Sequence, residues 1–232
     1  MARKGKNKKI QENKKEQRPV RFRRYKYLFL IVCEDQNTEP AYFRQFKAQI
    51  PEDTLYLREI GTGLDPKGVI EYAIIEKSKL SLESRKDVDA VWAVFDKDDA
   101  DKNDTTIKRF SDAFETAKNH DIQIAYSNEA FELWLLLHLT DIDGSIALPR
   151  QNIYRLLEEC IIKNKEYKSW KYQHGNSDIL KIIQEIGNQN NAINRAKKLL
   201  ISQEGKPPIE ANPSTKMHIL VGELLDWIAY YS

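Results

Sequence analysis

Two stretches decide the fold of this chain: YLFLIVCE at residues 27–34 and AVWAVFDKDD at residues 90–99. Each is an apolar run without strict alternation that ends in acidic residues. Such runs are typical of central parallel strands that helices cover on both faces. Because the carboxyl ends of parallel strands open onto the ligand crevice of an α/β sheet, we expect the two acidic ends to meet there if the strands are neighbours.

The acidic residues at these ends predict a magnesium site. Glu34 follows the first strand, and Asp96 and Asp98 end the other, two residues apart, so that their carboxylates point the same way. Clustered carboxylates repel one another until one takes a proton or a cation neutralises them. Mg²⁺, or Mn²⁺ in its place, suits such hard oxygen ligands. The plainer interpretation is that acidic residues after strands serve as turn formers or helix caps.

The rest of the sequence continues the alternation of strands and helices and then changes. Further strands are expected at residues 54–60 and 122–126, with helices at about 38–46, 66–80, 106–119 and 129–139. This order predicts an α/β domain over residues 27–145, with a parallel sheet flanked by helices. Residues 146–232 show no obvious strand and are expected to form a helical region packed on that domain, with helices at 151–163, 177–186, 191–200 and 215–231.

Composition and charge limit the class of protein. The 232 residues are 41% hydrophobic and include two cysteines, enough for a substantial core without a disulfide framework, which indicates a reducing cytoplasm. No apolar run reaches the roughly 20 residues that span a bilayer, so no membrane association is expected. Residues 1–26 hold twelve Lys or Arg against two Glu, a net +10, which leaves −8 for the rest of the chain. This basic arm has too few apolar residues to pack and is expected to be disordered.

Several basic residues are candidates for contact with nucleic acid. A basic arm can bind a phosphate backbone, but it can also improve solubility or touch an acidic partner. The stretch YKSWKYQH at residues 167–174 combines rings that stack on bases with lysines that meet phosphates, although its rings can equally belong to the core. The candidates are Lys8, Lys9, Arg21, Arg23, Arg24, Lys168, Trp170 and Lys171.

Two further motifs, SNEAFELWLLLH at residues 127–138 and NPSTK at residues 212–216, hold candidates for a supporting or phosphate-binding role. Each candidate also has a local explanation, since residues before a helix cap it and a histidine on an apolar helix is often a hydrogen-bonded core residue. Glu132 and His138 are six residues apart and do not share a helix face. The candidates are Asn128, Glu129, Glu132, His138, Ser214, Thr215 and Lys216.

The order of these motifs resembles the Toprim fold of topoisomerases, bacterial primases and OLD-type nucleases. Four segments together resemble the RloB family more closely: CEDQNTEPAYF at 33–43, VFDKDD at 94–99, SNEAFELWLLLH and NPSTK. Asp35 stands where that family usually has glycine, and Glu129-Ala130 where it often has proline and a small residue. The resemblance implies a role in phage defence by abortive infection, often beside an RloA-type ATPase encoded at the same locus.

Related Toprim effectors are metal-dependent nucleases that act on DNA or on RNA, including transfer RNA. For this chain the resemblance and the chemistry of phosphodiester cleavage together suggest Asp96 and Asp98 as metal ligands and Glu34 as ligand or general base. The alternative is a non-catalytic module that binds nucleic acid or an ATPase partner on a Toprim-like scaffold. Nucleotidyl transfer shares the metal chemistry, but no Gly-rich phosphate loop supports it. The sequence does not choose between DNA and RNA, and it does not give the oligomeric state.

Overall fold

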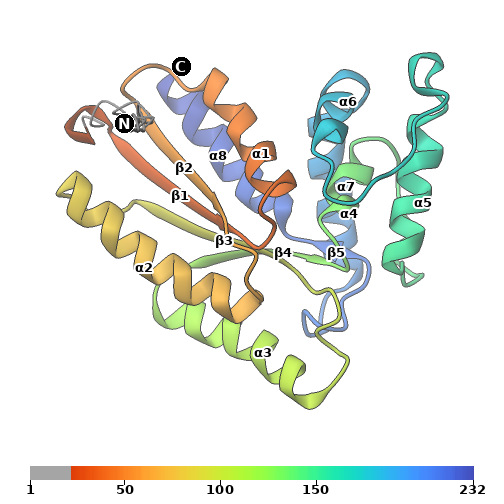
Figure 1. Cartoon of the computed structure of the whole chain (residues 1–232), viewed down its shortest axis with the longest axis horizontal. Helices are drawn as coiled ribbons and strands as arrows, with labels where there is room; N and C mark the ends of the chain where they lie inside the picture. The colour runs from red at the N-terminus through yellow and green to blue at the C-terminus, as the bar shows by residue number, and fades with distance from the viewer. Residues whose placement is uncertain (1–21) are drawn as a thin grey trace, which may run out of the picture.

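The computed structural model describes residues 22–232 and contains one five-stranded sheet (Figure 1). The strands lie in the order β2-β1-β3-β4-β5. The first four pair in parallel, and the short β5 runs antiparallel to β4. Their bounds are Tyr27–Cys33 (β1), Leu55–Gly61 (β2), Ala90–Asp96 (β3), Gln123–Asn128 (β4) and Ser214–Thr215 (β5).

Helices connect these strands and fill the second half of the chain. Four of them fall within the α/β part: α1 (Thr38–Arg44), α2 (Pro66–Ser84), α3 (Asp104–Asn119) and α4 (Glu132–Leu137). The later ones are α5 (Arg150–Ile161), α6 (Asp178–Ile186), α7 (Gln189–Ser202) and α8 (Met217–Tyr231). Short 3₁₀ segments occur at Phe22–Arg24 (η1), Gln45–Gln49 (η2) and Lys165–Tyr167 (η3). The predicted α/β class is therefore confirmed.

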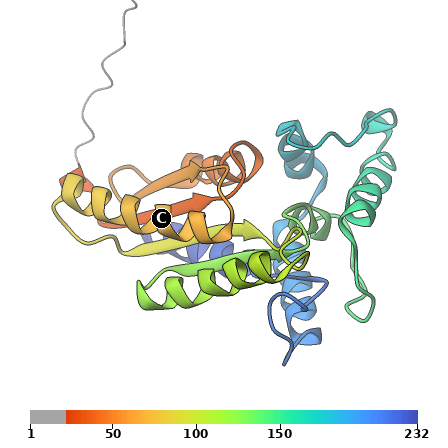
Figure 2. The same ribbon diagram turned by 60° about the horizontal axis from the view of Figure 1, so that its bottom comes forward.

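Both faces of the sheet are buried, which explains why the strands lack an alternating pattern. In β1, Phe29 and Ile31 point into a core shared with α1 and α8, whereas Leu28 and Leu30 point into a core shared with α2 and α3. Alternate residues of β3 divide in the same way. Figure 2 shows α2 and α3 side by side on one face, with α8 on the other. Helices on both faces are what near-continuous apolar strands require.

The remaining helices stand beyond the carboxyl ends of the strands. Figures 1 and 2 place α5, α6 and α7 at that end of the molecule, around the short α4. Both α5 and α7 pack on α4, which is completely buried. The carboxyl ends of the strands therefore face a helical wall and not open solvent.

The sequence pattern missed one strand. Ser214 and Thr215 were expected at the start of the last helix, but they pair with β4, and α8 begins only at Met217. A strand of two residues is too short to show a period in the sequence. It adds the edge beyond β4, and α8 then returns across the sheet.

Candidate active site

A cavity of about 200 Å³ lies at the carboxyl ends of β1 and β3. It is named here the acidic cavity, because six carboxylates stand among the residues that line it. Its lining residues are Glu34, Asp35, Thr38, Glu39, Asp96, Asp98, Phe131, Glu132, Arg150, Tyr154, His174 and Gly175.

The three carboxylates predicted from the strand ends are all in this cavity. Parallel pairing of β1 with β3 sets Cys33 opposite Val94, which carries Glu34 toward the end of β3. The backbone N–H of Asp96 donates to Oε2 of Glu34 at 2.9 Å. Asp98 lines the same cavity, while the intervening Lys97 points away and pairs with Asp101 at 2.7 Å. The structure thus brings Glu34, Asp96 and Asp98 together, as the strand pattern indicates.

Two more buried carboxylates complete the cluster. Glu132 begins α4 and Glu39 lies in the first turn of α1; both are buried. Sequence reasoning missed Glu39. Its position could have been found, because a helix that follows a strand directly turns its first residues back toward the strand end. Asp35, which occupies the usual glycine position of the resemblance, caps α1 by accepting from the backbone N–H groups of Asn37 and Thr38.

Burial and mutual repulsion favour the protonated forms of these acids. Burial raises the pKa of Glu34 to about 8, and the charges of Asp98 and Asp65 add to the effect. The pKa values of Glu39 and Asp96 are raised well above the usual range, first by burial and then by neighbouring carboxylates. Burial also raises the pKa of Glu132. At neutral pH, the cluster must therefore hold protons or a cation.

The opposite wall of the cavity comes from α5 and the loop after η3. Nη2 of Arg150 lies 2.8 Å from Oδ1 of Asp98, and burial raises the pKa of Asp98 despite this guanidinium. The hydroxyl of Tyr172 donates to Oε1 of Glu132. The ring of Tyr154 stacks on that of Tyr172, with centroids 4.4 Å apart. The sequence singled out residues 167–174 only as a candidate for contact with nucleic acid. It gave no signal that this loop and α5 reach the strand ends, because they do so only through tertiary packing.

The donor set fits a hard divalent cation in its chemistry. The acidic residues of the cavity offer carboxylate oxygens, which are hard donor atoms. The buried Oδ1 of Asp96 has no hydrogen-bond partner in the described part of the chain. Residues 22–232 contain no group of three or more Asp, Glu, His or Cys side chains already arranged to hold a metal ion. Arg150 and Tyr172 instead occupy two of the carboxylates. A cation would therefore be held by Glu34, Asp96 and Asp98 after these carboxylates exchange their present partners.

Most of the other acidic and hydroxyl candidates lie at a separate place, named here the β4–β5 junction. Oγ of Ser127 and Oγ1 of Thr215 are 3.0 Å apart, and Oγ of Ser214 donates to Ala211 O. Nδ2 of Asn128 donates to Pro208 O, and Glu129 accepts from Lys97 and Asn212. The ammonium of Lys216 lies over the ring of Tyr126. None of Asn128, Glu129, Ser214, Thr215 and Lys216 lines the acidic cavity; among these supporting candidates, only Glu132 does.

His138 ends α4 on the side away from the acidic cavity. Its Nδ1 lies 2.9 Å from Trp134 O, and the ring lines a different cavity. This placement agrees with the expectation that Glu132 and His138 do not share a helix face.

The basic candidates are dispersed. Arg24 pairs with Asp53, Lys171 pairs with Glu158, and Lys168 is exposed just after η3. Trp170 is half-buried with its ring edge toward Tyr172, which places it near the acidic cavity. Lys8, Lys9 and Arg21 lie outside the described residues, as does the side chain of Arg23.

No helix within residues 22–232 is long and apolar enough to cross a bilayer. Cys33 and Cys160 are both free thiols.

Comparisons with known proteins give the family and nothing beyond it. No curated protein and no solved structure matches the chain. A family described as RloB-like protein matches residues 29–224, most of the chain. This range contains both acidic strand ends, the α4 motif and the NPSTK motif. The chain therefore belongs to the RloB-like family.

Proposed function

We propose that this protein is a metal-dependent nuclease, active on DNA or RNA, with transfer RNA among the candidate substrates. The observation that carries the proposal is the acidic cavity. There Asp96, whose buried Oδ1 has no partner in the described part of the chain, stands with four other carboxyls whose pKa values are also raised. Like charges held together in a cleft cost stability, and such clusters occur where a site needs them. Mg²⁺ or Mn²⁺ at such oxygens supplies Lewis acidity that neutralises a scissile phosphate and activates water.

The residues of the chain divide the remaining tasks. Asp96 and Asp98 hold the cation, and Glu34 either joins them or accepts a proton from the attacking water. A pKa of about 8 suits proton transfer near neutral pH, since an effective general base titrates close to the working pH. Arg150 neutralises Asp98 in the described state, and its planar guanidinium is suited to bind the substrate phosphate once Asp98 turns to the cation.

The family membership extends the proposal to the cell. Resemblance to RloB proteins suggests an effector of phage defence by abortive infection, encoded beside an RloA-type ATPase in the cytoplasm. Release of Arg150 from Asp98 and of Tyr172 from Glu132 is the step that such a partner could control. A Toprim-like arrangement of the carboxylates is part of the same proposal.

A second candidate is a non-catalytic module that binds nucleic acid or an ATPase. The specific observation in its favour is that Arg150 and Tyr172 already occupy two carboxylates. On this hypothesis the acids and their partners form a structural network and never take up a metal.

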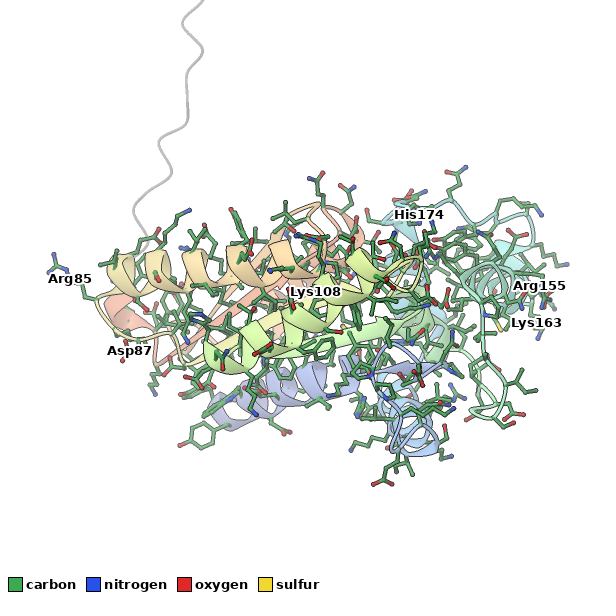
Figure 3. All side chains as sticks on the ribbon, turned by 90° about the horizontal axis from the view of Figure 1, so that it is seen from below. Arg85, Asp87, Lys108, Arg155, Lys163 and His174 are labelled. Atoms are coloured by element: carbon green, nitrogen blue, oxygen red, sulfur yellow. The ribbon has the colours of Figure 1, made fainter. Side chains whose placement is uncertain are left out.

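The deciding experiment compares the wild type with Asp96→Asn on plasmid DNA and on total RNA. Each substrate is incubated with Mg²⁺, Mn²⁺ or chelator, and with or without the ATPase encoded beside the protein. Asp87→Asn is the matched control, because Asp87 is exposed at the far end of the molecule from His174 (Figure 3). Cleavage that needs the metal and Asp96 but not Asp87 supports the nuclease. Nucleic-acid or ATPase binding without cleavage under every condition favours the module.

A further inference from the structure

A second cavity, larger than the acidic one, lies on the other side of α1 and α4. Its volume is about 380 Å³, against about 200 Å³ for the acidic cavity. Its floor is apolar and comes from η2 and α6 as well as α1, with Tyr42, Phe46, Leu180 and Ile183 buried there. His138 at the end of α4 completes the floor. Figure 1 shows α4, α6 and α7 gathered at this end of the molecule.

The polar lining of this cavity consists of amides. No Asp, Glu, Lys or Arg is among the described residues that line it, although charged residues make up 31% of the sequence. Six side-chain amides surround the floor: Gln45, Gln49, Gln184, Asn188, Gln189 and Asn190. This amide-lined cavity offers neutral donors and acceptors without a net charge. Such a lining suits a neutral group with both donors and acceptors, because an ion would leave its own charge unpaired.

Two polar atoms at the floor lack a complementary partner in the described part of the chain. The carbonyl of Trp134 can only accept, so Nδ1 of His138 carries the proton and Nε2 presents a lone pair. Burial lowers the pKa of His138, which keeps the ring neutral. The nearest polar neighbour of Nε2 is Oε1 of Gln189 at 3.5 Å, an acceptor that already takes the hydroxyl proton of Tyr42. The buried Nε2 of Gln189 has no partner in the described part of the chain.

The same two helices line both cavities. On α1, Glu39 lines the acidic cavity and Tyr42 lines the amide-lined cavity. On α4, Glu132 lines the acidic cavity and His138, at the end of the helix, lines the amide-lined cavity. The six-residue step along α4 rises about 9 Å at 1.5 Å per residue, and the two residues face different sides of the helix. The two cavities are thus neighbours that share α1 and α4 as a common wall.

We propose that the amide-lined cavity binds an unpaired nucleobase of the nucleic-acid substrate. Side-chain amides read base edges through paired donor and acceptor bonds, and enzymes that act on nucleic acid take unpaired bases into fitted pockets beside apolar and aromatic side chains. This inference rests on the proposed function, which makes the substrate a nucleic acid. It adds that the substrate is single-stranded or locally unpaired. A base in a duplex keeps its edge paired and cannot enter.

The test measures binding without any cleavage. Full-length protein in chelator is titrated by calorimetry with adenosine, guanosine, cytidine and uridine. The variant is the double substitution Gln45→Ala with Gln184→Ala, at one half-buried and one exposed position of the rim. Gln151→Ala is the matched control, because Gln151 is exposed on α5 and lines neither cavity. Asp96→Asn is measured in the same way.

At least one nucleoside is expected to bind the wild type, Gln151→Ala and Asp96→Asn with equal affinity, and the double variant at least about tenfold more weakly. A single-stranded oligonucleotide should displace that nucleoside and a duplex of the same sequence should not. Absence of binding by all four nucleosides, or equal binding by the double variant, overturns the inference. Because chelator and Asp96→Asn abolish the proposed cleavage, nucleoside binding is measured independently of it. The proposal of a base site can therefore be wrong while the proposed nuclease activity is right, and the proposed activity can be wrong while the base site is right.

Discussion

The acidic cavity and the β4–β5 junction are both clusters of polar groups near the carboxyl ends of the strands, but they are built in opposite ways. At the junction, most polar groups pair with one another, Ser127 with Thr215 and Glu129 with Lys97 and Asn212, while the buried Oδ1 of Asn128 has no partner among the described residues. In the acidic cavity, carboxyls face carboxyls, and their pKa values rise. Paired buried groups stabilise a fold, whereas a cluster of like charges weakens it. The pairing at the junction therefore stabilises the fold, whereas the cavity is the place of the proposed chemistry.

The largest effect on the proposed activity is expected from Asp96→Asn, which tests whether the cavity and the junction differ in role. The change keeps the shape of the side chain and removes the carboxylate at the centre of the cluster, so metal-dependent cleavage should fall by about 10³-fold or more, the scale of several kcal/mol of lost electrostatic stabilisation. The midpoint of thermal unfolding in chelator should stay the same or rise, because one repelling acid is gone. Cleavage rates and unfolding are measured on the same preparations. Loss of activity together with loss of stability would place Asp96 in a structural network.

The second-largest effect is expected in the pH dependence of stability, which should come from the acidic cavity and not from the β4–β5 junction. The pKa of Glu34 rises from 4.5 to about 8 on folding, so the folded state holds a proton that the unfolded state has released. The contribution of Glu34 to the free energy of unfolding therefore does not change with pH below about 4.5. It decreases as the pH rises from 4.5 to 8 and is constant again above pH 8. At about 1.4 kcal/mol per pKa unit, the decrease amounts to a few kcal/mol at most.

Urea unfolding in chelator at several pH values between 4.5 and 8.5 measures this slope. Glu34→Gln should flatten it, since glutamine does not titrate. Added Mg²⁺ should stabilise the wild type more at pH 8 than at pH 5, because a cation can replace the released protons. An unchanged slope in Glu34→Gln would mean that other acids of the cavity dominate the titration.

A smaller effect is expected from the junction. Thr215→Val keeps the side-chain shape but leaves the hydroxyl of Ser127 and the N–H of Met217 without a partner, at a cost of about 2 kcal/mol in unfolding free energy. Cleavage per folded molecule should not change. Thr105→Val, at an exposed position of α3, is the control and should be nearly neutral. A loss of cleavage without a loss of stability would move the junction into the active site.

The smallest expected effect concerns the guanidinium at the rim of the cavity. Arg150→Ala should weaken binding of a single-stranded oligonucleotide with non-cleavable linkages in Mg²⁺, where Asp98 releases the guanidinium, by about tenfold, the size of one lost charge-assisted hydrogen bond. Arg155→Ala is the matched control on the same helix, because Arg155 is exposed at the outer side of α5 (Figure 3). Fluorescence anisotropy gives both affinities. Equal affinities for the two variants would remove Arg150 from phosphate binding.

The sheet and the acidic strand ends could be predicted because their signals are local. An apolar run that ends in acid is visible within ten residues, and parallel pairing then brings Glu34 and Asp96 together. The place of Arg150 and Tyr172 at the cavity could not be predicted, although Tyr172 falls in the candidate stretch 167–174, since both reach it only through the packing of α5 and the loop after η3. The amide-lined cavity could not be predicted for the same reason, as its residues come from five separate elements, α1, η2, α4, α6 and α7.

The antiparallel pairing of β5 with β4 has a consequence for how the chain reaches its structure. Ser127 and Thr215 are 88 positions apart, so the edge of the sheet closes through a contact between segments that are distant in the sequence. Contacts between distant segments form slowly, because the chain between them must first lose its freedom. Until then, β4 keeps an open edge and the face beneath α8 stays uncovered, a state prone to aggregation. Yield of soluble protein should thus depend strongly on expression temperature.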